Sequence, residues 1–112
     1  MPILNPDYSN LNYEEISAAI GLKVKHMPML IGSFLEESQT IMLSLGEAID
    51  SKNYADIKSH AHSIKGSAGN LKFNEIYDMA KEVELSAAEN NENFDYKAYF
   101  DAIKTAISTI PQ

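Results

Sequence analysis

His62 is the residue of this chain whose surroundings most strongly suggest chemistry. Wound as a helix at about 100° per residue, the segment around it places Lys65, Gly66 and Gly69 on the face that carries the imidazole. Each glycine inside a helix costs about 1 kcal/mol relative to alanine. Close packing against another helix would explain the two glycines. A bare patch that also carries a histidine and a lysine points instead to a space for another molecule, and spacing alone leaves both explanations open.

A neutral imidazole nitrogen can attack phosphorus, accept a proton or bind a metal. On a helix His60 and His62 point about 200° apart, so they cannot chelate one ion. A hydrolase needs a nucleophile beside a base and an oxyanion hole. Ser59 and Ser63 lie near His62, but helical N–H groups are already bonded and no carboxylate is an obvious third member. Catalysis by this chain alone is therefore not expected, and an ordinary surface histidine is the remaining alternative.

The composition is that of a globular protein. Of 112 residues, 45% are hydrophobic and 22% are charged, which argues against disorder. The net charge of −7 disfavours binding to nucleic acid or to an anionic membrane. The absence of Cys excludes disulfides, thiolate metal sites and cysteine nucleophiles. No apolar run approaches the roughly 20 residues of a spanning helix and the first residues do not form a signal peptide, so a cytoplasmic protein is expected.

Apolar residues recur at three-four spacing through most of the chain, which predicts helices and no strands. Asn12, Asn53 and Asn74 are the expected N-caps of the first, third and fourth helices. The expected helices cover a short segment, 13–20, and four longer ones, 28–52, 54–71, 75–88 and 96–110, after an irregular segment over 1–11. Amphipathic helices joined by short loops predict an all-α antiparallel four-helix bundle with a short additional N-terminal helix, in one domain over 1–112.

The segment 61–71 reads Ala-His-Ser-Ile-Lys-Gly-Ser-Ala-Gly-Asn-Leu. It resembles the signature of histidine-containing phosphotransfer (HPt) domains of multistep two-component phosphorelays, in which Ala-His precedes a hydrophobic residue, Lys-Gly and small residues. The resemblance implies that His62 is the phosphoacceptor, that Lys65 offsets phosphoryl charge and that Gly66 leaves room for the partner. The family often has Gly after the last hydrophobic residue, where this chain has Lys72. That departure affects the expected geometry of a turn, away from His62.

The resemblance implies a phosphorelay intermediate. His62 would accept a phosphoryl group from the aspartyl-phosphate of a receiver domain and pass it to the Asp of another receiver. The implied partners are receiver domains of a sensor kinase and of a response regulator. The chain would be a monomeric carrier with no bound cofactor and no kinase or hydrolase activity of its own, and Mg²⁺ would belong to the receiver. The alternative is a pseudo-phosphotransfer or adaptor bundle that docks a receiver without carrying phosphate, against which His62, Lys65 and Gly66 argue.

The surroundings of His62 lead to two further expectations. In an antiparallel hairpin Glu84 lies opposite His62, where it either orients the imidazole or stands as a solvated carboxylate; the Val83-Glu84 pair also resembles the family's apolar-Glu step. The helix over 28–52 has an apolar face wider than a bundle core requires. Some of its side chains are therefore expected to stay exposed beside His62 as a docking patch, with Ile31 and Leu35 as the first candidates.

Overall fold

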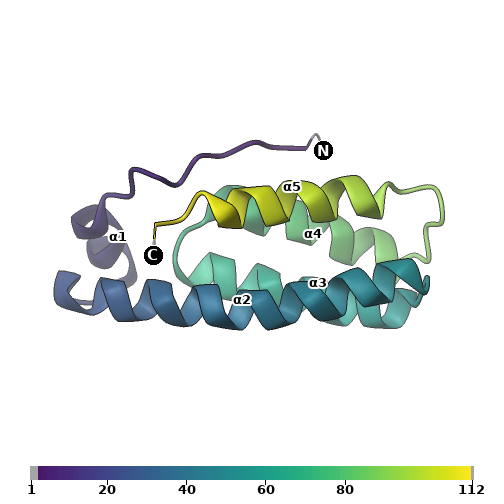
Figure 1. The fold of residues 1–112 in the computed structure, drawn as a ribbon, viewed down its shortest axis with the longest axis horizontal. Helices are drawn as coiled ribbons and strands as arrows, with labels where there is room; N and C mark the ends of the chain where they lie inside the picture. Colours follow the sequence, from purple (N-terminus) through teal and green to yellow (C-terminus); the bar gives the residue numbers. More distant parts are fainter. Residues whose placement is uncertain (1–2, 112) are drawn as a thin grey trace.

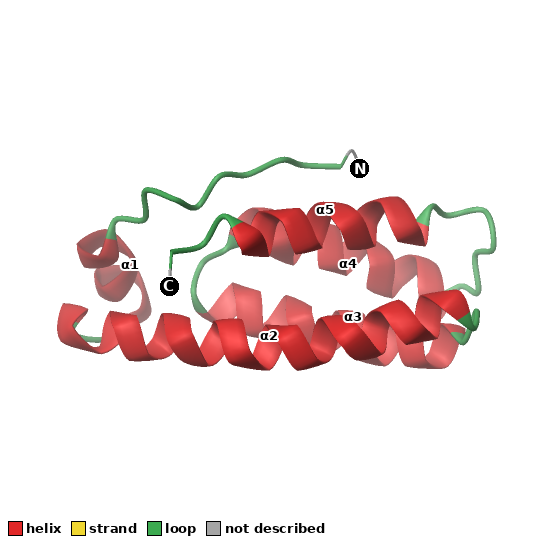
Figure 2. Cartoon of the chain, in the orientation of Figure 1, coloured by secondary structure: helices red, strands yellow, loops and turns green. Residues whose placement is uncertain are grey.

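A computed structural model describes residues 3–111, and all of their regular structure is helical (Figure 2). The helices are α1 (Tyr13–Ile20), the short 3₁₀ turn η1 (Val24–His26), α2 (Met27–Asp50), α3 (Tyr54–Asn70), α4 (Asn74–Ala88) and α5 (Tyr96–Ser108). Helices α2 to α5 form an elongated bundle and α1 lies beside one end of it (Figure 1). The predicted all-α bundle with an extra N-terminal helix is confirmed. None of the helices over 3–111 has both the length and the hydropathy of a bilayer-spanning segment.

The four long helices enclose one apolar core. Helix α2 packs on α3 and α5, and α4 packs on the same two helices, so the four occupy the corners of a square. The most deeply buried large side chains are Met27, Leu45, Ile57, Ile64, Phe73, Ile76, Met79, Val83 and Ile103. Tyr8 attaches the irregular N-terminal segment to this core. Its ring centroid lies 4.8 Å from that of Phe73, and its hydroxyl donates a hydrogen bond to Glu75 Oε1 at 2.8 Å.

The helix starts follow the capping rules at three positions. The side chains of Asn12, Asn53 and Asp95 each accept a hydrogen bond from the backbone N–H three residues on, which satisfies a donor left free at the start of a helix. The prediction that Asn74 caps the fourth helix is wrong. Phe73 occupies that position without a side-chain cap, and Asn74 is the first residue of α4. Burial of the Phe73 ring, which is 1% exposed, holds the chain there instead.

The turn between α3 and α4 forms without the glycine that the signature often has. Lys72 adopts φ +62°, in the left-handed region that costs a non-glycine residue about 1–2 kcal/mol. Two hydrogen bonds close the turn, from Lys72 N to the carbonyl of Gly69 at 3.2 Å and from Phe73 N to the carbonyl of Ala68 at 3.0 Å. The tight connection is therefore retained, and with it the register of α3 against α4.

The expectation that Ile31 is exposed on the second helix is wrong, because Ile31 is 2% exposed. Leu35 is only partly buried, as expected. A groove between α2 and α5 is lined by Ile31 and Leu35 together with Phe100 and Ile107 of α5. The wide apolar face of α2 thus serves two neighbours, α3 on one side and α5 on the other. The most exposed apolar side chains on α2 are Met29 and Leu43, each 66% exposed.

Candidate functional site

His62 is held on the outer face of α3. The inner face of that helix carries the buried residues Ile57, Ala61, Ile64 and Ala68, whose spacing matches one side of a helix. Burial of this stripe sets the rotation of α3 and directs the imidazole away from the core. The side chain of His62 is 68% exposed, so its ring is open to a partner molecule.

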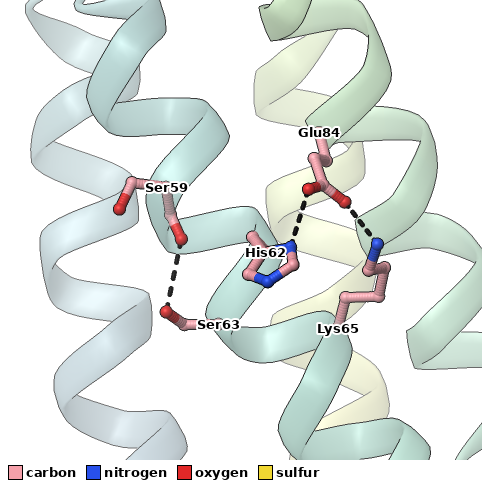
Figure 3. Close-up of polar contacts among 5 residues, drawn as sticks. All are labelled: Ser59, His62, Ser63, Lys65 and Glu84. Atoms are coloured by element: carbon pink, nitrogen blue, oxygen red, sulfur yellow. Dashed lines mark hydrogen bonds and ion pairs between the residues drawn. The ribbon is translucent and has the colours of Figure 1, made fainter.

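A carboxylate on the neighbouring helix joins the histidine to a lysine (Figure 3). His62 Nδ1 lies 2.8 Å from Glu84 Oε2, and Lys65 Nζ lies 2.6 Å from Glu84 Oε1. Figure 3 shows the second ring nitrogen of His62 turned away from Glu84. The structure therefore brings together the two polar residues predicted from the signature, and it selects the orienting position for Glu84 that the sequence had left open.

The contacts of Glu84 with Lys65 and His62 lower the pKa of Glu84, and the contact with Glu84 raises the pKa of Lys65. Partial burial raises the pKa of Glu84, but the hydrogen bonds from Lys65 and His62 outweigh it, so this pKa lies below the ordinary value of 4.5. The hydrogen bond to Glu84 raises the pKa of Lys65 above its ordinary value of 10.5, against the opposing effect of burial. An ionised carboxylate only accepts hydrogen bonds. His62 Nδ1 therefore carries the proton that it donates, and in the neutral ring the lone pair is on Nε2.

Stability should depend on pH through Glu84. Its pKa is lower in the folded chain than the ordinary value of 4.5, so its stabilising contribution is complete above that value and is lost as pH falls through the folded-state pKa. The variant Glu84→Gln lacks this contribution. We expect the difference in free energy of unfolding between the wild type and Glu84→Gln, measured by urea denaturation, to narrow between about pH 6 and about pH 3. An equal difference at both pH values would contradict the ion pairs.

Gly66 and Gly69 differ in what surrounds them. A Cβ added at Gly66 would meet no atom within 4 Å, so the helix is bare towards open space one turn from His62. A Cβ at Gly69 would lie 3.1 Å from Cδ2 of Tyr77, which is a close packing contact with α4. Packing thus explains Gly69, whereas nothing in the bundle requires Gly66 to lack a side chain. Of the two glycines singled out from the sequence, only Gly66 faces open space.

The hydroxyl group of Ser63, one residue from His62, is bonded within its own helix. Glu84 supplies a carboxylate bonded to the imidazole, but Ser63 Oγ donates to the backbone carbonyl of Ser59 at 3.2 Å. Ser63 is therefore not bonded to the imidazole as a nucleophile would be to its base. Over residues 3–111 no group of three or more His, Asp or Glu side chains is arranged to hold a metal ion.

Sequence comparison agrees with the geometry. The family model of the Hpt domain matches residues 29–112. This range covers α2 from its third residue onward, the whole of α3 to α5, and every residue of the site. No curated protein and no solved structure matches the chain significantly. The match covers most of the chain, and the chain belongs to the Hpt-domain family, whose members carry out phosphotransfer in two-component signalling and interact with receiver domains.

Proposed function

We propose that the chain is a phosphorelay intermediate that carries a phosphoryl group on His62. It takes the group from the aspartyl-phosphate of one receiver domain and delivers it to the Asp of another. The observation that carries the proposal is the orientation of the imidazole: Nδ1 is bonded to Glu84 at 2.8 Å while the ring is 68% exposed. The nucleophilic nitrogen is thus presented to solvent on a rigid helix.

The transfer step follows from this tautomer. The lone pair of Nε2 attacks the phosphorus of the acyl phosphate, an N–P bond forms, and the bond between phosphorus and the aspartyl oxygen breaks. The aspartate leaves as a carboxylate, and the imidazole becomes a cation that keeps its proton on Nδ1. Glu84, which accepts that proton's hydrogen bond, stabilises the new positive charge. No proton has to leave the ring, so the reverse step onto another Asp uses the same arrangement.

Lys65 would act on the transferred phosphoryl group, and Gly66 would allow the receiver domain to approach. The Lys65 ammonium lies within the same cluster as His62 and would offset the negative charge of the phosphoryl oxygens. Gly66 leaves the helix surface open, so the receiver's active site can approach the imidazole. The receiver would bring the Mg²⁺ that phosphoryl transfer uses. This chain then acts as a carrier that needs no cofactor of its own.

Incubation with a phosphorylated receiver domain tests the proposal. We expect the phosphoryl group to move to this chain in a form labile to acid and stable to alkali, with a ³¹P resonance of an Nε2-phosphorylated histidine. A receiver in which the phosphorylated Asp is replaced by Asn is the matched control. Binding to the receiver without any phosphate transfer would contradict the proposal and would favour the alternative of a module that only docks receivers.

A further inference from the structure

Tyr77 of α4 lies beside Lys65, at the edge of the site. Its ring centroid is 5.9 Å from Lys65 Nζ, and the same nitrogen is 2.6 Å from Glu84 Oε1. Tyr77 and Glu84 are seven positions apart, which places them on the same face of α4, two turns from each other. The Lys65 ammonium is therefore held between an aromatic ring and a carboxylate of the same helix.

Gly69 makes room for this ring. It lies four positions after Lys65 on α3, one turn away, and a Cβ on it would lie 3.1 Å from Cδ2 and 3.4 Å from Cε2 of Tyr77. The ring packs on bare helix backbone at Gly69, the last residue but one of α3. The niche at Gly69 thus brings the ring towards the stem of Lys65.

A lysine side chain has four rotatable bonds and loses much conformational entropy when it is fixed. Lys65 is nevertheless confined, because its side chain is only 21% exposed. Tyr77 is not among the buried core residues of α4, which are Ile76, Met79, Ala80, Val83 and Ala87. The position of its ring is better explained by its contacts with α3 at Lys65 and Gly69 than by the bundle core.

We propose that Tyr77 is a positioning residue for phosphoryl transfer, whose ring confines the Lys65 ammonium beside Glu84 and within reach of a phosphoryl group on His62. This inference rests on the function proposed above and adds a residue to it. The interaction needs the aromatic face and not the hydroxyl, because a cation is attracted to the face of the ring. The variant Tyr77→Phe should therefore retain the positioning role, whereas Tyr77→Leu should lose it.

A double-mutant cycle tests this role. The rate of transfer from a phosphorylated receiver is measured in a single turnover for the wild type, Tyr77→Leu, Tyr77→Phe, Lys65→Met and the Tyr77→Leu/Lys65→Met double variant. We expect Tyr77→Leu to slow transfer about two- to fivefold, the range of a cation–π contact near the surface, and Tyr77→Phe to stay within about twofold of the wild type. In the Lys65→Met background Tyr77→Leu should have no further effect.

An NMR measurement separates this inference from the proposed function. The ring should shift the Lys65 side-chain proton resonances upfield, and this shift should persist in Tyr77→Phe and disappear in Tyr77→Leu. An unchanged Lys65 spectrum in Tyr77→Leu, or equal slowing of transfer with and without Lys65, would overturn the positioning role. Failure of the wild type to accept phosphate would instead overturn the proposed function and the role in transfer with it, while the spectrum would still report the Lys65–Tyr77 contact.

Discussion

The variant His62→Gln is expected to lose phosphoryl acceptance completely and to remain folded. Glutamine is polar and of similar size, but its amide has no nitrogen lone pair able to attack phosphorus. The imidazole is 68% exposed, and substitutions at exposed positions usually change the free energy of unfolding by less than about 0.5 kcal/mol. Glu84 keeps its ion pair with Lys65 in this variant. Transfer of acid-labile phosphate from a receiver and thermal melting by circular dichroism measure the two expectations.

The other two histidines provide matched controls. His60 and His26 are half-buried, and within residues 3–111 neither imidazole is bonded to a carboxylate as that of His62 is. His60→Gln and His26→Gln should therefore accept phosphate at rates close to the wild type. Phosphate on His62→Gln, or loss of transfer in either control with the fold intact, would show that the phosphoacceptor has been misassigned.

The arrangement of helices could be predicted because each long helix buries one side. In α3 the buried residues follow the three-four spacing of a single stripe, and the same is true of α5. The caps at Asn12 and Asn53 are local, since each side chain bonds to a backbone N–H three residues on. The sequence around each cap is therefore enough to predict it. Asn74 shows the limit of that pattern. Burial of Phe73 decides where α4 begins, and that burial depends on residues of other helices.

The side-chain contacts between helices could not be derived from the sequence and are known only from the structure. A short antiparallel turn predicts that Glu84 lies opposite His62. Whether its carboxylate bonds to His62 and to Lys65 depends on the positions of the side chains, which no periodicity within one helix contains. The burial of Ile31, which is 2% exposed, is a similar case, because it depends on how the rest of the chain packs against α2. A wide apolar face predicts that a helix has more than one neighbour, but it does not say whether the second neighbour belongs to the same chain.

The helix rule treats Gly66 and Gly69 alike, because each lies within α3 and glycine favours a helix less than alanine does. Their environments differ, because a side chain at Gly66 would point into open space, whereas a side chain at Gly69 would meet Tyr77. This contrast gives two variants of the same helix with different expected effects on stability. Gly66→Ala should raise the free energy of unfolding by up to about 1 kcal/mol. Gly69→Ala should raise it less, or lower it, because the new methyl group requires the Tyr77 ring to move.

A larger side chain at Gly66 is expected to block phosphoryl transfer without unfolding the bundle. Gly66→Gln should slow single-turnover transfer from a phosphorylated receiver by at least about tenfold, a loss of about 1.4 kcal/mol of transition-state stabilisation, because it fills the space through which the partner approaches. Gly66→Glu should slow transfer further, since its carboxylate also repels the phosphoryl oxygens. Both residues favour helices more than glycine does, so melting temperatures should not fall.

The series Gly66→Ala, Gly66→Gln and Gly66→Glu separates access from packing. If the glycine serves access, transfer declines with side-chain size while stability stays constant or rises, and affinity for the receiver declines together with the rate. If the glycine serves packing, all three variants lose stability together and transfer declines only to the extent that the chain unfolds. The absence of any atom within 4 Å of a Cβ at this position predicts the first pattern. Melting of the bundle by Gly66→Glu would therefore rule out the access role, because a side chain pointing into solvent has no neighbour in the bundle to displace.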